Sequence, residues 1–544
     1  MPSDKDTPPD TPAPKPPAKE SGKDSAKNSA KESTKPTARS AAKGRRARPT
    51  PAKVLTHAEI RAIVVAIALA MLLGALDQTI VATALPTIGR HFADVENLSW
   101  VVTAYLLTGT AVTPLYGKLS DIHGRRILMV IAITVFIVGS VACALAPSML
   151  ALVLARALQG LGGGGLIALA QTIIADIVTP RERGRYQGYI SAVFAISSVS
   201  GPVLGGFLTE HVDWSLIFWI NLPLGLVALV ACHIVLRRVP YRPRRHRLDL
   251  IGAALMMSGA VLLLLALTWG GRRFEWISAP IGGLLLGSAL AWALFAWRLV
   301  AVREPFLPLT VLGNPVVRCA ALAGACGMGA LVGMTIFVPL YFEVVLHLSA
   351  SQSGLALIPL MSGTVIASTV AGQAMGRVTH YKRMGLAGFF EAILAMAALA
   401  IWPGSMPTVL VIVMLAVAGL GIGLVFPITT VAMQNAVAAM QMGIATGASN
   451  FFRSLVSSVV VAVLGAIVIG GLGGTGEVAL ESLARVAAGH DLVTAFRFVF
   501  MAVALVLGFG LCFLIAMEEK PLRGPAAAAP VGETGAPAAP TPPQ

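Results

Sequence analysis

Long apolar runs, separated by short polar segments, follow one another from residue 60 to residue 516. Each run holds about 20 residues or more, and a helix of that length crosses the ~30 Å hydrocarbon core of a bilayer. Strands of a membrane barrel would instead alternate over ~10 residues. The pattern therefore predicts an all-α polytopic membrane protein. Its fourteen expected spans have the approximate limits 60–86, 98–116, 127–146, 149–173, 186–208, 216–236, 249–269, 277–298, 318–342, 353–375, 384–402, 408–430, 447–470 and 495–516.

The composition points the same way. Of the 544 residues, 56% are hydrophobic and 12% are charged, whereas soluble domains carry about 25% charged residues. Residues 1–56 are rich in Pro, Lys, Ser, Ala and Thr, so they lack the apolar surface needed to fold. We predict a disordered basic tail at 1–56 and a second disordered tail at 518–544. The five cysteines lie in apolar runs without metal-ligand spacing, so we expect no metal site.

Basic residues are distributed unevenly between the loops. Of the 41 Lys and Arg, thirteen lie in the first 53 residues; beyond them, segments expected on one side of the membrane carry 22 and those on the other side carry five. Cytoplasmic loops are the ones enriched in Lys and Arg. We therefore predict that both termini are cytoplasmic. The net charge of +15 follows from the tail and these loops, and does not indicate a nucleic-acid partner.

Asp77 is an acidic residue inside the first run, about nine residues before Pro86, or ~13 Å along a helix. A carboxylate near the membrane midplane must face a partner or a wet cavity, and desolvation disfavours its charged form. We predict that Asp77 binds and releases the proton that drives transport. The alternative is a structural acid paired with a neighbouring helix.

Three other charged residues lie in or near the runs. Glu391, about seven residues into the eleventh run, is predicted as a second proton-coupling acid. The alternative is that it extends toward Lys382 or Arg383 at the membrane surface. Arg453 and Asp176 lie close to the ends of their runs, and we predict that both are interface charges.

The second and third runs are joined by the sequence GKLSDIHGRR. Gly117 and Gly124 flank this segment, and Asp121 can bind a helix N-terminus or pair with Arg125 or Arg126 in one conformation only. We predict a conformational lock at the cytoplasmic face. The segment closely resembles motif A of the major facilitator superfamily.

The fourth run contains Arg156 within RALQGLG, which resembles motif B of the same superfamily. A guanidinium buried in the membrane needs an acceptor, and the resemblance implies that Arg156 takes part in proton transfer. An arginine that only fixes helix packing is the alternative.

The fifth run contains SSVSGPVLGG, which resembles motif C, the antiporter motif, with Ser197 where the family often has Gly. Glycines allow close helix packing and a proline kinks the span. Motif C is found mainly in exporters, so the resemblance implies export; a packing seam is the alternative. The residues that carry the motif are Gly201, Pro202, Gly205 and Gly206.

Further stretches narrow the resemblance to the fourteen-span drug:proton antiporters, over about residues 58–517. These stretches are LDQTIVATALP at 76–86, WVVTAYLL at 100–107 and FWINLPLG at 218–225. The chain departs from the family pattern at Ser215, where an aromatic is usual. It departs again at 376–383, where a second copy of motif A lacks the acid and the second glycine.

The family fold implies two six-helix bundles, 57–247 and 318–517, joined by two extra spans within 248–317. Their first, fourth, ninth and twelfth spans would line a central cavity. Met and aromatic side chains suit a promiscuous apolar pocket, although ordinary core packing is the alternative for each. The expected cavity residues are Thr79, Tyr105, Gln159, Gln171, Met334, Phe337 and Phe426.

The sequence therefore predicts an exporter and not an enzyme. No nucleotide-binding motif is present, so we expect the proton motive force as the driving force and no cofactor. We expect a monomer in the plasma membrane of a bacterium that exports lipophilic, often cationic, small molecules by alternating access. A dedicated exporter of a lipid or of one secondary metabolite is one alternative. A receptor or scaffold on the same fold is another, although a static protein has no need of a lock.

Overall fold

The computed structural model describes residues 55–94, 97–239, 248–271, 273–471 and 492–522. They belong to one compact unit, Lys53–Gln544. The two predicted tails lie almost wholly outside the described residues. Among the residues described there is no β-strand, only an isolated bridge between Gly270 and Phe274. The prediction of an all-helical fold is confirmed.

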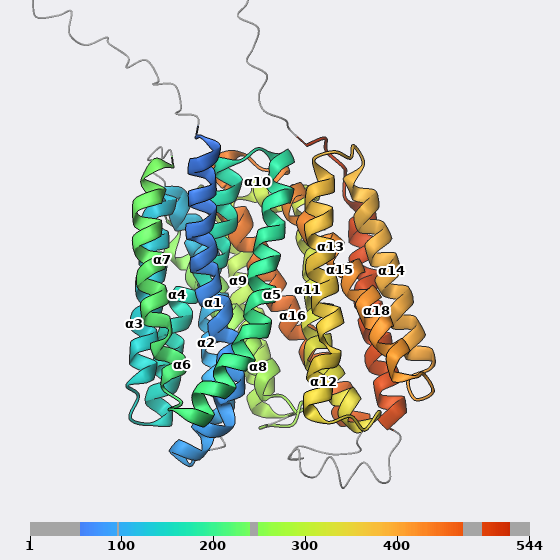
Figure 1. Cartoon of the computed structure of the whole chain (residues 1–544). Coiled ribbons are helices and arrows are strands. Elements are labelled where there is room, and N and C mark those ends of the chain that lie inside the picture. Colours follow the sequence, from blue (N-terminus) through green and yellow to red (C-terminus); the bar gives the residue numbers. More distant parts are fainter. Residues whose placement is uncertain (1–54, 95–96, 240–247, 272, 472–491, 523–544) are drawn as a thin grey trace, which may run out of the picture. The chain divides into compact units, whose positions relative to one another are not determined.

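The first seven helices pack against one another (Figure 1). Apolar side chains buried between them form two clusters, one around Phe136 and one around Phe218. The helices are α1 (His57–Phe92), α2 (Leu98–His123), α3 (Arg125–Ala144), α4 (Met149–Ile177), α5 (Pro180–His211), α6 (Leu216–Trp219) and α7 (Asn221–Val235), followed by the 3-10 turn η1 (Leu236–Arg238).

Helices α8 (Leu250–Trp269) and α9 (Ala279–Ala301) pair with each other, and α8 also contacts α2 and α16. The remaining helices form a second group around one large apolar cluster. They are α10 (Leu309–Leu312), α11 (Pro315–Val344), α12 (Ala350–Ala356), α13 (Ile358–Met375), α14 (Tyr381–Ile401), α15 (Thr408–Ala436), η2 (Ala439–Gln441), α16 (Met442–Gly471) and α18 (Leu492–Ala516).

Each of the fourteen predicted spans corresponds to a helix, or to a helix pair such as α6 with α7. In the described part of the chain, thirteen helices are long and apolar enough to cross a membrane. The remaining predicted span, at 98–116, corresponds to α2, which has 26 residues and is long enough to cross a bilayer. Many large apolar side chains, such as Leu154 and Phe509, are exposed on the outer surfaces of the helices, as expected where lipid is the solvent.

Two helices end at positions that differ from the prediction, and both contain or precede a proline. Pro86 was expected to close the first span, yet it lies inside α1, which continues to Phe92. Packing of Phe92 on Trp214, with ring centroids 5.4 Å apart, stabilises this extension. By contrast, α6 ends at Trp219 because the ring of Pro223 conflicts with the carbonyl four residues earlier. The break places Asn221 at the start of α7.

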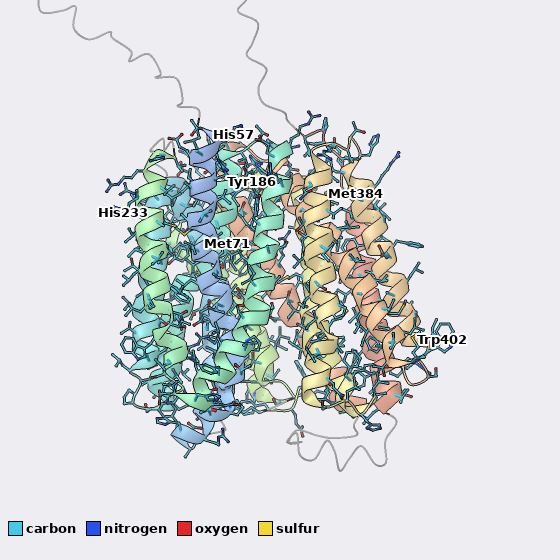
Figure 2. All side chains as sticks on the ribbon, viewed as in Figure 1. His57, Met71, Tyr186, His233, Met384 and Trp402 are labelled. Carbon is cyan, nitrogen blue, oxygen red and sulfur yellow. The ribbon has the colours of Figure 1, made fainter. Side chains whose placement is uncertain are left out.

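The helix bundle has two ends, which we call the terminal face and the opposite face. At the terminal face α1 begins and α18 ends (Figure 1). His57, Tyr186 and Met384 lie toward the terminal face, and Trp402 lies toward the opposite face (Figure 2).

Candidate functional site

Asp77 and Arg156 form an ion pair inside the first group of helices. Nη1 of Arg156 on α4 lies 2.6 Å from Oδ2 of Asp77 on α1, and the side chains are 1% and 0% exposed. Each predicted charge therefore has the other as its partner. Asp77 is therefore a buried acid that faces a neighbouring helix. This arrangement is compatible with both predicted roles of Asp77, proton binding and structural pairing.

Two amides complete the coordination of Asp77. Its Oδ1 accepts hydrogen bonds from Nε2 of Gln159, at 2.8 Å, and from Nδ2 of Asn221, at 3.0 Å. Gln159 lies one turn from Arg156 and also accepts a hydrogen bond from its Nη1, at 2.6 Å. The Nε of Arg156 donates to the carbonyl of Val101, at 3.0 Å. The carboxylate and the guanidinium are thus held by α1, α2, α4 and α7 together.

Asn221 was not singled out from the sequence. A signal was available, because it is a polar residue in an apolar run, just before a proline that breaks the helix. Its Nδ2 also donates to Ser140 on α3, at 3.0 Å. We refer to Asp77, Arg156, Gln159, Asn221 and Ser140 as the buried polar cluster.

Tyr105 separates the buried polar cluster from a large cavity. The guanidinium carbon of Arg156 lies 4.3 Å from the centroid of the Tyr105 ring, close enough for a cation–π contact. Tyr105 also lines the cavity, as does its neighbour Gln78 on α1. The ion pair therefore adjoins the cavity through the thickness of one aromatic ring.

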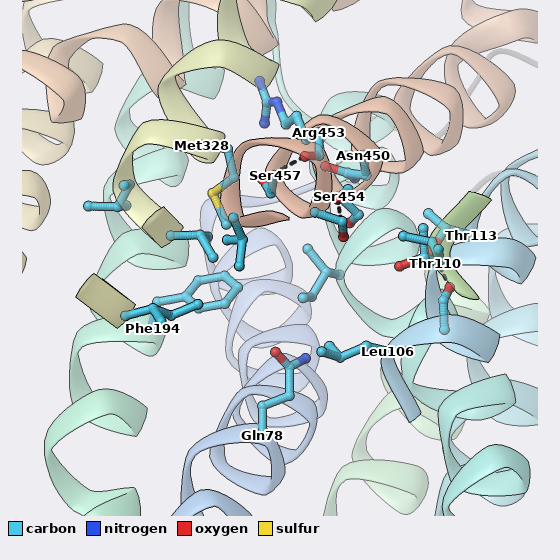
Figure 3. A pocket seen from close by; sticks show the side chains of 18 of the residues that line it. Gln78, Leu106, Thr110, Thr113, Phe194, Met328, Asn450, Arg453, Ser454 and Ser457 are labelled. Atoms are coloured by element: carbon cyan, nitrogen blue, oxygen red, sulfur yellow. Dashed lines mark hydrogen bonds between the residues drawn. The ribbon is translucent and has the colours of Figure 1, made fainter. Parts of the chain in front are cut away.

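The cavity has a volume of about 1550 Å³ and is lined by both groups of helices and by α8. Drug-sized pockets hold ~300–1,000 Å³, so this cavity exceeds the needs of one small ligand. Figure 3 shows Gln78 of α1, Phe194 of α5, Met328 of α11 and Arg453 of α16 around it.

Four of the seven expected cavity residues line this cavity, and three do not. The lining residues are Tyr105, Gln171, Phe337 and Phe426. Of the others, Gln159 belongs to the buried polar cluster and Met334 is 1% exposed in the apolar core of the second group. Thr79 instead donates to the carbonyl of Ser197 on α5, at 2.9 Å.

Arg453 is not an interface charge, and that prediction is wrong. Helix α16 begins at Met442, five residues earlier than the apolar run suggested. Arg453 therefore lies eleven residues inside the helix, ~16 Å from its start, where it lines the cavity. Its Nη2 donates to the hydroxyls of Thr429 and Thr430, each at 3.0 Å.

The motif A segment joins the two groups of helices at the terminal face. Asp121 accepts hydrogen bonds from the backbone N–H groups of Gly443, at 3.1 Å, and Ile444, at 3.0 Å. These are free N–H groups of the first turn of α16, where the helix dipole also favours a negative charge. Asp121 is paired with Arg125 at 2.5 Å, and Arg125 reaches Asp176 on α4 at 2.7 Å.

The other motif A residues have defined positions. Gly124 separates α2 from α3 with a φ of 95°, a conformation that residues with a Cβ rarely adopt. Arg126 points away from Asp121 and contacts His233 on α7, at 3.0 Å. A Cβ at Gly117 would collide with the carbonyl of Gly443, so this glycine allows α2 and α16 to touch.

The same closure repeats between α5 and α13. A Cβ at Gly184 would collide with the carbonyl of Gly372, and the reverse also holds. Deeper in the bundle, the hydroxyls of Ser191 and Ser368 lie 2.7 Å apart. Asn450 donates to Gln171 at 2.8 Å. These contacts close the cavity on its terminal side.

Motif C forms the seam between α5 and α1. A Cβ at Gly201 would collide with the hydroxyl of Thr79, and one at Gly205 with the hydroxyl of Thr83. Pro202 is exposed within α5. A Cβ at Gly206 would meet nothing within 4 Å. Two of the three motif glycines are therefore required for the contact.

Glu391 is not brought together with the other predicted proton-coupling residues. It is half-buried on α14, which packs mainly on α15 and α18. It does not line the cavity. No hydrogen bond or ion pair joins it to another residue that the structure describes.

Comparison with known proteins identifies the class of protein and then its family. The Major Facilitator Superfamily model matches residues 67–461, which span most of this helical bundle. The chain belongs to the Major Facilitator Superfamily, and the resemblance found in the sequence is confirmed. It is a multi-pass membrane protein.

Several curated relatives are named multidrug transporters or efflux pumps. Multidrug transporter protein MdtP of Bacillus subtilis (strain 168) is 33% identical over 407 residues, 74% of each chain. An uncharacterized MFS-type transporter of Mycobacterium tuberculosis (strain ATCC 25618 / H37Rv) is 37% identical over 411 residues, 75% of this chain. The match spans 59% of that relative's length.

Solved structures share the fold at low identity. The human organic anion transporter MFSD10 (TETRAN) superposes with a TM-score of 0.58 at 15% identity, over 82% of this chain and 99% of that one. A bacterial homologue of the iron transporter ferroportin, in its outward-facing state, gives a TM-score of 0.59 at 12% identity, over 84% and 99% of the two chains. These structures support the fold alone.

Proposed function

We propose that the chain is a proton-coupled antiporter that exports lipophilic small molecules across a bacterial plasma membrane by alternating access. The observation that carries the proposal is the buried Asp77–Arg156 ion pair, which lies one aromatic ring away from the cavity. Ionisable groups at membrane depth are functional by default. The names of curated relatives, among them Multidrug transporter protein MdtP, support export of drug-like substrates.

The terminal face is cytoplasmic in this proposal, because the segments expected there carry most of the Lys and Arg. The conformation is then closed to the cytoplasm by the contacts of Asp121 and Gly184. The cavity extends to Gly270 and Trp276, in the connection between α8 and α9 at the other end of the bundle. It would therefore be open toward the outside.

The proton would act by separating the ion pair. In this conformation the carboxylate of Asp77 has a counter-charge and two amide donors. A proton taken from outside onto an Asp77 oxygen would cancel the attraction and release the guanidinium of Arg156. Movement of α1 and α4 would then favour the other conformation, from which Asp77 loses the proton to the cytoplasm.

The moving parts would be the two helix groups. We propose that 57–247 and 318–517 are the two six-helix bundles of the family, linked by the pair within 248–317. Asp121 would stabilise the closed cytoplasmic side. Its carboxylate oxygens can accept hydrogen bonds from the N–H groups at the start of α16 only when the two bundles are in contact. Gly201 and Gly205 would allow α1 to slide along α5. Glu391 remains a candidate for a second proton site, although no hydrogen bond or ion pair joins it to another described residue in this conformation.

A dedicated exporter of one metabolite is the main alternative. This alternative is supported by relatives such as "Efflux pump FUS6" of Gibberella moniliformis (strain M3125 / FGSC 7600). The size of the cavity, about 1550 Å³, favours a broad substrate range. A static receptor or scaffold would have no use for the Asp121 lock.

The test is transport by purified full chain in proteoliposomes, with an imposed pH gradient and a panel of lipophilic substrates. Proton-driven movement of several unrelated substrates supports the proposal. Movement of a single compound would favour the dedicated exporter. A pH gradient without effect on any compound would contradict proton coupling.

A further inference from the structure

Arg453 is the only charged side chain among the described residues that line the cavity. No Asp, Glu or Lys accompanies it there, and the carboxylate of Asp77 lies behind Tyr105 with no exposed surface. The electrostatic field inside the cavity is therefore dominated by one guanidinium, within walls of low dielectric that screen it weakly.

The guanidinium of Arg453 lacks a counter-charge. In the described part of the chain it has no carboxylate within ion-pair distance. Its Nη2 binds the hydroxyls of Thr429 and Thr430, whereas its Nε is buried without a hydrogen bond. Arg156, by comparison, has Asp77 and four further contacts, with Val101, Gln159 and the rings of Tyr105 and Phe218. A buried cation left unpaired is costly, so an anion bound beside Arg453 would lower the free energy of the site.

The neighbouring groups suit an amphiphilic anion. Asn450, Ser454 and Ser457 follow the same side of α16 and line the cavity near Arg453 (Figure 3). The hydroxyl of Ser457 already donates to the carbonyl of Arg453, and one N–H of Asn450 donates to Gln171. The hydroxyl of Ser454 and the second N–H of Asn450 can donate to carboxylate or sulfonate oxygens. Apolar lining residues such as Met328 and Phe426 can hold a hydrocarbon body. Gly324 on α11 leaves space for the guanidinium, since a Cβ there would lie 2.7 Å from Nη2.

We propose that Arg453 is a substrate-binding residue that selects lipophilic anions, with a carboxylate or sulfonate group bound to its guanidinium. The inference rests on the proposed function, in which this cavity holds the substrate. It reverses the expectation of often cationic substrates.

Equilibrium binding tests the inference without any pH gradient. Purified full chain in a neutral detergent is titrated calorimetrically with three probes of similar shape: 2-naphthalenesulfonate, 2-naphthalenesulfonamide and 2-naphthyltrimethylammonium. The wild type should bind the sulfonate about ten-fold more tightly than the other two, a difference of roughly 1.4 kcal/mol. Arg453→Ala should remove this ten-fold preference, whereas Arg453→Lys should retain most of it.

The control is Arg318→Ala, which removes the same charge from an exposed position on α11 and should leave all three affinities unchanged. If Arg453→Ala fails to fold, Gly324→Ala displaces the guanidinium while keeping the charge, and should also weaken sulfonate binding alone. Equal sulfonate affinity in the wild type and the folded variant would overturn the inference, as would tightest binding of the cation or no binding at all. Loss of proton coupling in transport, with the sulfonate preference intact, would refute the proposed function only.

Discussion

Asp77 and Arg156 are 79 positions apart in the chain, yet their side chains meet at 2.6 Å with almost no exposed surface. Two charges buried together cost desolvation energy, which their attraction recovers only when the remaining hydrogen-bonding sites are also satisfied. Gln159 and Asn221 supply those bonds to Asp77. Removal of one charge alone should therefore be far more damaging than removal of both.

The first prediction follows from this pairing. Arg156→Met should destabilise the protein by about 3–5 kcal/mol at neutral pH, because the Asp77 carboxylate is left buried without its partner. The double variant Asp77→Asn with Arg156→Met should recover most of the lost stability, because neither charge then remains buried without a partner. Thermal unfolding in detergent compares the wild type with both variants; identical melting temperatures for the single and double variants would contradict the pairing.

The second prediction concerns the closure at the terminal face. Asp121→Asn loses the ion pair to Arg125 and weakens charge-assisted bonds to α16 that are worth roughly 1.5–3 kcal/mol. Transport should slow by about ten-fold or more, while equilibrium binding of 2-naphthalenesulfonate changes little, because Asp121 does not line the cavity. Asp213→Asn, an exposed acid in the α5–α6 connection, is the matched control. Wild-type turnover in Asp121→Asn would remove the lock from the mechanism.

The third prediction concerns the seam between α5 and α1. Gly201→Leu should abolish transport while the protein still inserts, since the new side chain would collide with Thr79. Gly206→Leu is a control on the same helix, because a side chain there has open space. Efflux assays on membranes with equal amounts of each variant give the comparison. Equal loss in both variants would mean that the motif C contact has no special role.

The fourth prediction concerns orientation. Reporter fusions after Arg238 and after Glu275 flank α8 and should report the cytoplasm and the outside, respectively, as the distribution of Lys and Arg requires. If both reporters lie on one side, α8 does not cross the membrane and the orientation used here is wrong.

The fold was largely predictable because length and hydropathy alone identify a membrane-spanning helix. The helix ends were less predictable, since polar residues extend helices beyond the apolar runs. Thr56 caps α1 through a reciprocal bond with Glu59, and α16 starts five residues before its run. Because of that extension, Arg453 lines the cavity and does not lie at the membrane surface, where it was expected.

The site was only partly predictable because rotation about a helix axis cannot be inferred when a helix is apolar on all sides. Asp77 and Arg156 could be identified, since a charge in an apolar run stands out. Thr79 and Met334 could not be assigned to the right face, because neither neighbour pattern nor composition distinguishes a cavity from a packed interface.

The most direct test of the account is substrate-driven proton movement in proteoliposomes that contain pyranine, a pH-sensitive dye. A gradient of 2-naphthalenesulfonate, which does not itself carry protons across a bilayer, should drive protons in the opposite direction in the wild type. Asp77→Asn, which stays neutral at every pH, should abolish this movement, and Glu391→Gln should preserve it. Proton movement by Asp77→Asn at the wild-type rate would show that another group carries the proton and would contradict the central claim.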